Sequence, residues 1–340
     1  SGIGVYLLVK ELFPKLPDKY LLLGILFYWF NPISIVDVWN RFLLNYIFFF
    51  ALLPVASYFF IKGLKTGKFF WSFLLNIILI FYSYALSYVA FSILLWIWLS
   101  LITFFYALFD KSLKSKIFSL KYFILTLLLF MIVNCWWILP LVSLYSFGGA
   151  SPTSELFMKQ NNLGTLQALS EKTGNLTNVF KLINASFLAP DSLDWVKHYY
   201  SPLLYVIQYA FVGVILHFII KFRKDPTVLF LGSLFLSAIF LSKGNNSPFG
   251  EIYNFIFRNV LILQVFRNPF EKFGFLLSLS AALLFSPSIY ELSKKLQNKM
   301  KTFYYPLIFI IVFSLGFPLY TNLAFTNKFP PTNDYSIGYK

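Results

Sequence analysis

Long stretches without a charged side chain constrain this sequence more than any other feature. Asp, Glu, Lys and Arg are absent from eight stretches: 20–36, 42–61, 69–109, 122–154, 198–220, 226–242, 273–290 and 302–327. A helix needs about 20 apolar residues to cross the hydrocarbon core of a bilayer. The stretches lack the alternation of polar and apolar residues that is typical of barrel strands. Because helices satisfy their own backbone hydrogen bonds in lipid, the pattern predicts a helical membrane protein.

Composition excludes a water-soluble fold. Of the 340 residues, 59% are hydrophobic and 12% are charged, against about 25% charged residues in an ordinary soluble domain. Burial saturates with chain size, so a soluble fold of this length cannot hide so much apolar surface. The single cysteine, Cys135, excludes a disulfide framework, and the two histidines, His198 and His217, are few for a zinc, haem or copper site.

The charge-free stretches predict an all-α fold in one transmembrane domain over 1–320. We expect ten helical segments, the first of them partial: 1–12, 19–31, 41–62, 69–84, 88–109, 120–146, 201–221, 226–242, 272–290 and 303–320. The domain is therefore predicted to be a polytopic bundle of about nine to ten transmembrane helices with outside loops.

Positively charged residues gather in short loops between the predicted helices. Five loops hold 17 of the 28 Lys and Arg residues: 10–19, 62–68, 110–121, 221–225 and 291–301. Cytoplasmic loops of membrane proteins carry such an excess, so we place these five loops in the cytoplasm. The net charge of +15 then reflects topology and contact with anionic membrane lipids. No basic face suits a nucleic acid.

The remaining segments then lie outside a cell membrane that the chain crosses many times. They are the loops 147–200 and 243–271 and the polar tail 321–340, which indicates that a further outside domain follows. The outside segments contain three N-x-[ST] sequons: Asn175, Asn184 and Asn245. These three asparagines are candidates for glycosylation if the protein is exported in a glycosylating cell.

A first candidate site lies where one predicted helix ends, in the segment NPISIVDVWNR that begins at Asn31. The Asn-Pro step ends the preceding helix, because the residue before a proline disfavours helical geometry. Asp37 and Arg41 are four residues apart, so a following helix places both on one face. They form either an ion pair at the membrane interface, with Trp39 as an aromatic anchor, or one wall of an outward-facing polar site.

A second candidate site contains two Arg-Asn pairs that begin nine residues apart, at Arg258 and Arg267. Too few apolar residues separate the pairs to span a membrane, which predicts a short interfacial or re-entrant helix ending near the proline after Asn268. Glu271 and Lys272 follow this proline. Arginine presents a planar fork that matches phosphate oxygens, and lysine adds a point charge. The alternative is that these charges mark the start of a helix.

A third feature is the segment MIVNCWWILP, in which Asn134 lies inside an apolar stretch and Pro140 lies near its end. The proline predicts a kink, and the asparagine must find hydrogen bonds inside the bundle. His198 follows two aspartates in a loop that we interpret as solvated. His217 lies within a predicted helix, where a hydrogen-bonded core histidine is expected.

Several segments together resemble the large integral membrane glycosyltransferases of the GT-C type. The first are GIGVYLLVKEL and LLLGILFYWFNPISIVDVWNRF, the next is NCWWILPLVSLY, and the last is FRNPFEKFGFLLSLSAALLF. The last segment is similar to the arabinofuranosyltransferase-like branch, which includes mycobacterial cell-wall enzymes. The resemblance covers most of 1–320 in order. It implies a multi-helix membrane fold whose outward active site moves a sugar from a polyprenyl-phosphate donor to a glycan, lipid or protein.

The resemblance implies that the donor phosphate contacts Arg267, Asn268 and Lys272. We add two further cations, Arg258 and Arg41, to this predicted binding site. The resemblance carries over no catalytic base, because the catalytic acid of the family usually lies in an outside loop that would precede residue 1. The residues themselves offer only Asp37 and Glu271 as weak candidates. A divalent metal ion held by a carboxylate and the donor phosphate could assist, but no pair of acidic residues has a suitable spacing.

Three functions therefore stay open. The first is glycosyl transfer from a polyprenyl-phosphate sugar to an outside acceptor. The second is a non-catalytic accessory subunit with partners in a membrane complex, which fits the lack of an acidic pair and of cofactor ligands. The third is a transporter or lipid flippase, although such proteins tend to show internal repeats and charges at mid-membrane depth.

Overall fold

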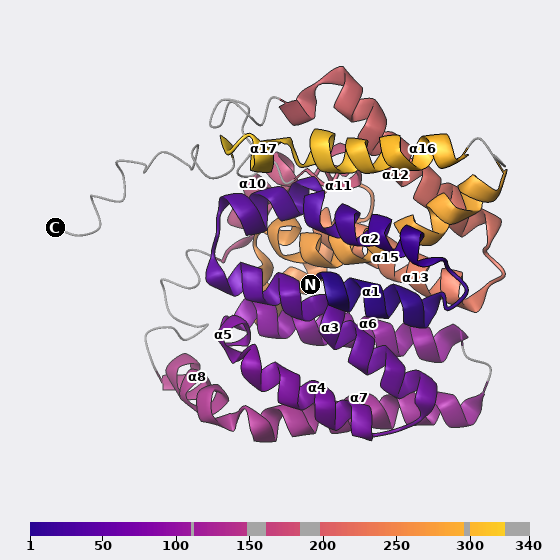
Figure 1. Cartoon of the computed structure of the whole chain (residues 1–340). Helices are drawn as coiled ribbons and strands as arrows, with labels where there is room; N and C mark the ends of the chain where they lie inside the picture. Colours follow the sequence, from indigo (N-terminus) through magenta and orange to yellow (C-terminus); the bar gives the residue numbers. More distant parts are fainter. Residues whose placement is uncertain (110–111, 148–160, 184–197, 296–299, 324–340) are drawn as a thin grey trace.

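A computed structural model describes residues 1–109, 112–147, 161–183, 198–295 and 300–323 (Figure 1). Every regular element in these ranges is helical. The elements are α1 (Gly2–Leu12), α2 (Asp18–Phe30), the π-helix η1 (Ser34–Asn40), α3 (Leu44–Thr66), α4 (Phe70–Phe81), α5 (Ser83–Leu86), α6 (Val89–Phe109), α7 (Leu113–Val133), α8 (Cys135–Phe147), α10 (Leu163–Thr173), α11 (Leu176–Phe180), α12 (Pro202–Lys221), α13 (Pro226–Ser242), α14 (Gly250–Asn259), the 3-10 helix η3 (Leu261–Phe266), α15 (Pro269–Lys295), α16 (Met300–Phe309), the π-helix η5 (Ile310–Leu315) and α17 (Phe317–Tyr320). The all-α prediction is confirmed for this part of the chain.

Local sequence signals explain where helices begin and end. Asp225 caps α13: its Oδ1 accepts hydrogen bonds from the backbone N–H groups of Thr227 at 2.7 Å and Val228 at 3.3 Å. Pro226 follows at the first helical position, where a missing N–H has no cost. Gly67 ends α3 in the left-handed region at φ 66°, a conformation that glycine adopts without a steric penalty.

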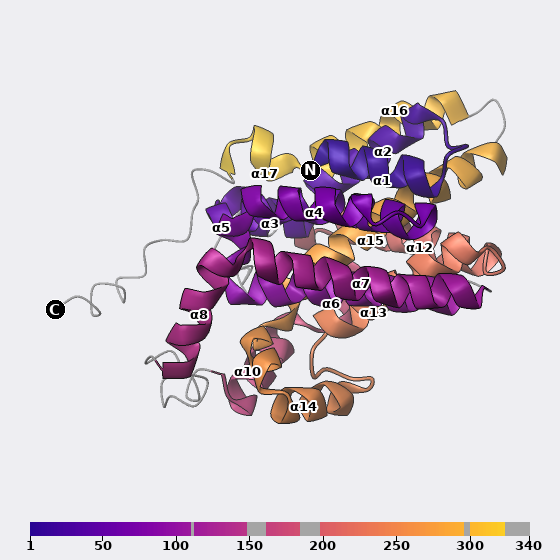
Figure 2. The same cartoon turned by 90° about the horizontal axis from the view of Figure 1, so that it is seen from below.

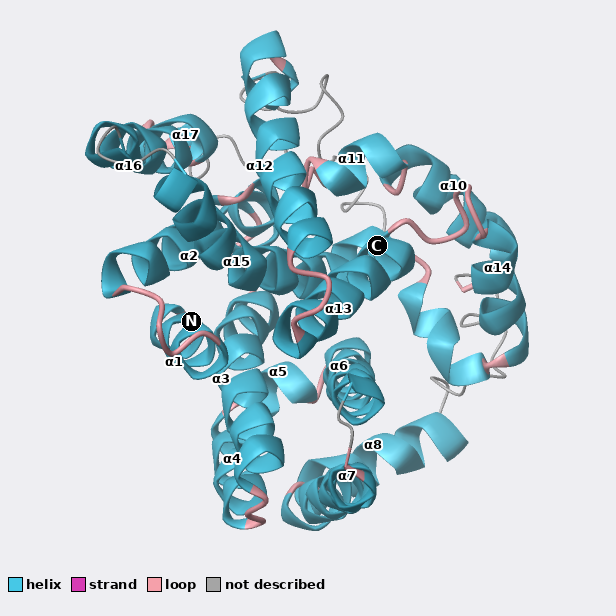
Figure 3. Ribbon diagram, turned by 90° about the vertical axis from the view of Figure 1, so that its right-hand side faces the viewer, coloured by secondary structure: helices cyan, strands magenta, loops and turns pink. Residues whose placement is uncertain are grey.

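The longest helix, α15, forms the centre of the bundle. It is almost entirely buried and contacts α1, α2, α12 and α13 (Figures 2 and 3). Small residues permit close packing: a Cβ on Gly24 of α2 would lie 2.3 Å from Oγ of Ser286 and 3.0 Å from the carbonyl oxygen of Ala282 on α15. At the edge of the bundle, α7 exposes large apolar side chains such as Leu128 and Ile132, as expected for a helix that faces lipid.

The apolar helices identify a membrane protein. Five of them are long and apolar enough to cross a bilayer, namely α3, α6, α7, α12 and α15, and a sixth crossing results if α2 and η1, bent by 65°, form one span. The number of nine to ten is thus not confirmed within the described ranges. Four further apolar segments are shorter, at 10–17 residues: Phe70–Phe81, Cys135–Leu144, Pro226–Ser242 and Tyr304–Leu315.

The prediction of one continuous helix over 120–146 is wrong. The chain is helical from Leu113, breaks at Asn134 and continues as α8. The side chain of Asn134 is fully buried, donates to the carbonyl of Phe130 at 3.2 Å and accepts from the indole of Trp137 at 3.0 Å. The buried amide thus finds its hydrogen bonds within the break itself, as the sequence predicts for an asparagine inside an apolar bundle. Pro140 lies within α8 and does not end it.

Successive long helices alternate in direction, which gives the bundle two distinct ends (Figure 1). At one end, α2 and α13 finish and α3, α6 and α15 begin; we call this the site end. At the opposite end, α1, α3, α6 and α12 finish and α7 and α13 begin (Figures 1 and 2). The described residues of the five lysine-rich loops lie there, so we call it the lysine-rich end. Helices α10, α11 and α14 lie together at one side of the bundle (Figure 3).

Candidate functional site

The candidate site begins at the bend between α2 and η1. Asn31 ends α2, as the Asn-Pro step predicts, and its fully buried side chain holds the bend in place. Its Nδ2 donates to the carbonyl of Tyr28 at 2.8 Å and to Oγ of Ser278 on α15 at 2.7 Å. The π-helical turn η1 follows directly. It carries Asp37 and places Arg41 beside the start of α15.

Six polar side chains meet at this point and form what we call the charge cluster: Asp37, Arg41, Tyr46, Asn268, Glu271 and Lys272. Glu271 is at its centre. Its Oε1 lies 2.8 Å from Nη1 of Arg41 and 2.9 Å from Nζ of Lys272, and it accepts the hydroxyl of Tyr46. Its Oε2 accepts from Nδ2 of Asn268 at 2.8 Å.

Burial makes the charge cluster energetically demanding. Asp37 is fully buried and pairs with Nη1 of Arg41 at 3.4 Å, while Glu271 and Lys272 are 8% and 5% exposed. Removal of one partner from a buried ion pair costs about 3–5 kcal/mol, because the other charge is left without compensation. Four buried or nearly buried charged side chains that contact one another in an apolar bundle mark the cluster as a candidate functional site.

Aromatic rings form the walls around the cationic part of the cluster. Nζ of Lys272 lies 4.6 Å from the ring centre of Tyr46, 5.1 Å from that of Tyr88 and 5.3 Å from that of Phe91. The guanidinium of Arg41 lies 4.8 Å from the ring centre of Tyr46. The negative ring faces stabilise both cations inside a region of low dielectric.

An apolar groove of about 620 Å³ is lined by α6, α7, α8 and η3, and its lining includes none of the six residues of the charge cluster. Its lining includes Val89, Trp96, Trp137, Leu261 and Val265. Val89 directly follows Tyr88, whose ring contacts Lys272. Val265 is two residues before Arg267, which ends η3. Two separate segments of the chain, Tyr88–Val89 and Val265–Arg267, therefore connect the groove lining to the charged site.

The structure brings four of the sequence-predicted charged residues into the charge cluster: Asp37, Arg41, Glu271 and Lys272. Arg267 is half-buried and directly precedes Asn268. Arg258 is exposed in the last turn of α14. The segment between the two Arg-Asn pairs forms the short 3-10 helix η3, which ends just before Arg267. The interfacial position of this segment and the role of Arg258 in binding stay predictions.

Sequence reasoning missed Tyr46 and Tyr88. Tyr46 donates to Glu271 and also accepts from Lys272, yet it lies inside a charge-free apolar stretch with many other aromatic residues. Tyr88 lies in the short break between α5 and α6. A signal was available only for Tyr46, which comes shortly after Arg41 at the predicted outer surface. Nothing in the sequence distinguishes Tyr88 from the other 21 tyrosines.

Neighbouring polar features occupy the same end of the bundle. Lys181 is 2% exposed, and its Nζ lies 3.7 Å from the ring centre of Tyr205 and 5.3 Å from that of Tyr200. Burial lowers the pKa of Lys181 to about 8. His198 does not stand in a solvated loop: its Nε2 lies 3.0 Å from the carbonyl oxygen of Ser314, and its ring stacks on Phe317.

The expectation for His217 is wrong, because this residue is exposed on α12 and is not part of the core. Two sequons can be placed. Asn175 is exposed, but its Oδ1 caps α11 by accepting from Asn178 N–H at 2.8 Å, and Asn245 is half-buried. Asn184, the two aspartates before His198 and most of the tail 321–340 lie outside the described residues.

The described residues contain no group of three or more His, Cys, Asp or Glu that could hold a metal ion. The two carboxylates of the charge cluster are already engaged by Arg41 and Lys272, so no step through a metal ion is derived for them. Comparisons with protein-family models, with curated protein sequences and with solved structures find no match for this chain.

Proposed function

We propose that this protein binds a polyprenyl-phosphate sugar within the membrane and takes part in the transfer of that sugar to an acceptor outside. Two observations support the proposal: a buried cluster that contains cations, and an apolar groove whose lining residue Val89 directly follows Tyr88, a ring that contacts Lys272. A polyprenyl-phosphate donor has these same two parts, a long apolar chain and a charged phosphate.

The cations of the charge cluster offer a suitable environment for the phosphate. The cluster and the adjacent Arg267 together supply three cations, Arg41, Arg267 and Lys272, against two carboxylates. Pro269 and Glu271 lie in the first turn of α15, whose positive dipole end favours an anion. A departing lipid phosphate gains negative charge, and fixed positive charge at that position lowers the barrier.

Asn268 supplies an acceptor in the same place. Its amide nitrogen is committed to Glu271, which fixes the orientation of the side chain. The Oδ1 atom is buried and has no hydrogen-bond partner among the described residues. A buried carbonyl of this kind gains about 1–3 kcal/mol when it meets a donor, and a sugar hydroxyl next to the phosphate is such a donor.

The proposal includes an orientation and a number of crossings. The site end faces outside, and the lysine-rich end faces the cytoplasm, in agreement with the positive-inside pattern. The five longer helices, the bent pair α2–η1 and the shorter apolar segments within α4, α13 and α16–η5 make nine crossings, and α1 is the partial tenth. The α13 segment of 17 residues is about 25 Å long at 1.5 Å per residue, close to the thickness of the hydrocarbon core.

The test is direct binding of a photoreactive polyprenyl phosphate to the protein in phosphatidylcholine nanodiscs. We expect Arg267→Ala to weaken binding roughly ten- to a hundredfold, because one or two charge-assisted hydrogen bonds are lost. Arg267→Lys should recover only part of the affinity, since the bidentate fork is missing. Lys114→Ala, at the opposite end on α7, is the control for a general loss of positive charge.

The groove is tested separately with two substitutions on the same helix. Ser92 lines the groove, whereas Ser100 is exposed elsewhere on α6. Ser92→Trp should fill the groove and reduce crosslinking, and Ser100→Trp should leave it unchanged. Equal binding by all of these variants and the wild type would sink the proposal.

A second function is favoured by one specific observation. Both candidate bases, Asp37 and Glu271, are held by cations and hydrogen bonds, which is the arrangement of a structural network and not of a free base. An accessory subunit that binds the lipid without turnover fits this state. Release of polyprenyl phosphate from a labelled polyprenyl-phosphate sugar separates the two: an enzyme releases it and loses this activity in Asp37→Asn or Glu271→Gln, whereas an accessory subunit only binds.

A further inference from the structure

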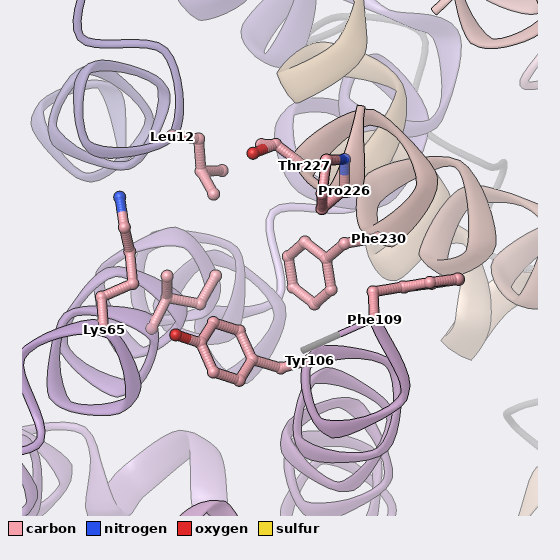
Figure 4. Close-up of a pocket in the computed structure, with 8 residues that line it drawn as sticks. Leu12, Lys65, Tyr106, Phe109, Pro226, Thr227 and Phe230 are labelled. Carbon is pink, nitrogen blue, oxygen red and sulfur yellow. The ribbon is translucent and has the colours of Figure 1, made fainter. Parts of the chain in front are cut away.

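A second hollowed region lies at the lysine-rich end, far from the charge cluster. A pocket of about 390 Å³ lies where α1, α3, α6 and α13 approach one another, with Leu12 and Thr227 on neighbouring walls (Figure 4). Leu12 and Thr227 also line the next hollow, of about 490 Å³. That hollow shares Phe218, Phe222 and Glu291 with a third, of about 330 Å³, between α12 and α15. We call the second and third hollows together the α12–α15 furrow.

One part of the furrow is apolar and open. Its α12 wall is formed by Ala210, Gly213 and Val214, and its α15 wall includes Leu292. Gly213 leaves real space, because a Cβ at this position would meet no atom within 4 Å. From Ala210 to Lys221 the helix rises about 16 Å at 1.5 Å per residue, about half the thickness of the hydrocarbon core. The furrow thus has the length of one leaflet.

The other part of the furrow carries charge at the level where the helices end. Glu291 lies 2.7 Å from Nζ of Lys294 and 3.6 Å from Nζ of Lys221. Both lysines remain accessible, with side chains 53% and 35% exposed. Lys15 lies on the same rim, and Asp225 there uses its carboxylate to cap α13. The furrow is therefore lined by three lysines, Lys15, Lys221 and Lys294, and by one carboxylate without a capping role, that of Glu291.

We propose that the α12–α15 furrow binds one anionic phospholipid, with an acyl chain along Gly213 and the phosphate at Lys221 and Lys294. An apolar channel that ends in a cationic rim matches an amphiphile with a single anionic head group. The surrounding loops, which hold 17 of the 28 Lys and Arg residues, raise the local concentration of anionic lipid. This site is separate from the charge cluster and from the apolar groove of α6, α7, α8 and η3, and it goes beyond the function proposed above.

The experiment places the full chain in nanodiscs of phosphatidylcholine with 20% phosphatidylglycerol, and native mass spectrometry counts the lipids that remain bound. We expect one retained phosphatidylglycerol on the wild type. Gly213→Phe fills the furrow and should remove that lipid. Val206→Phe, on the lipid-exposed face of the same helix, is the matched control and should keep it.

Charge is tested with a second pair of variants. Lys221→Gln combined with Lys294→Gln should lower the preference for phosphatidylglycerol over phosphatidylcholine about fivefold per lysine. Lys114→Gln combined with Lys116→Gln, exposed on α7 at the same end, should leave the preference unchanged. Equal retention by Gly213→Phe and Val206→Phe would overturn the proposal, as would an unchanged preference in the first double variant. Displacement of the lipid by inorganic phosphate alone would also refute the proposal, because the acyl chain of the lipid would then contribute nothing to binding.

Discussion

Helix α15 carries a glutamate between two cations near each of its ends, and the two arrangements differ chiefly in burial. At the site end, Glu271 pairs with Arg41 at 2.8 Å and Lys272 at 2.9 Å, and the three side chains are 10%, 17% and 6% exposed. At the lysine-rich end, Glu291 pairs with Lys294 and Lys221, and its own side chain is 23% exposed. The same charge pattern is thus enclosed at one end and solvated at the other.

The difference shows that composition alone does not assign a role to a charged triad. Water and salt screen the pairs of Glu291, so these contribute little to stability, and their lysines stay available to an anion. The pairs of Glu271 lie in a medium of low dielectric, where each partner requires the others. The four predictions below test this contrast.

The largest expected difference is in the labelling of cysteines placed at the two ends of the bundle: in intact cells one end should react with the reagent and the other should not. In a Cys135→Ser background, Asn259→Cys at the end of α14 should react with an impermeant maleimide on intact cells. Lys116→Cys on α7 should react only after the cells are opened. Both positions are exposed in the structure, so burial cannot explain a failure. Labelling of Lys116→Cys alone in intact cells would reverse the proposed orientation.

The next largest effect should be on stability. Glu271→Gln leaves Arg41 and Lys272 buried with less compensation, so we expect a loss of about 3–5 kcal/mol in the free energy of unfolding. Glu291→Gln should cost less than about 1 kcal/mol. Unfolding of the two variants in the same detergent, followed by circular dichroism, measures the contrast. Similar losses at both ends would show that burial does not separate the two triads.

A third prediction concerns pH. Burial lowers the pKa of Lys181 to about 8 in the folded chain, below about 10.4 for an exposed lysine. Between these values the unfolded chain binds more protons than the folded chain, so stability should rise with pH from about 8 to 10.5. Lys181→Met should flatten this rise in apparent melting temperature, whereas Lys116→Met should not. A wild-type stability that falls over this range would contradict the buried, aromatic environment of Lys181.

The smallest effect is expected for the exposed pair of Lys10 and Asp18, whose Nζ and Oδ1 atoms are 2.7 Å apart. The hydrogen bond with Asp18 raises the pKa of Lys10, so any stabilisation is present at neutral pH and is lost above the raised pKa. Because the pair is solvated, Asp18→Asn should shift the melting temperature by less than about 2 °C. In 1 M salt the wild type and Asp18→Asn should have the same melting temperature, because salt screens the exposed pair. A larger change would mean that the pair is part of a network.

Much of the fold was predictable because apolar length and charge placement are local properties. The segments 88–109, 201–221 and 226–242 agree with α6, α12 and α13 within a residue at each end. The Asn-Pro step placed the end of α2 correctly, and the positive residues identified which loops share one end. Each of these inferences needs only the thickness of a bilayer and the backbone preference of a proline.

The sequence by itself determined an all-helical membrane protein with charged residues at Asp37, Arg41, Glu271 and Lys272. Only the tertiary structure decided that these four residues meet, since Arg41 and Glu271 are 230 positions apart. It also decided that Asn134 interrupts a helix and that Tyr46 joins the cluster. The physical reason is that a buried polar side chain is stable only with its partners, and partners supplied by distant helices leave no local pattern in the sequence.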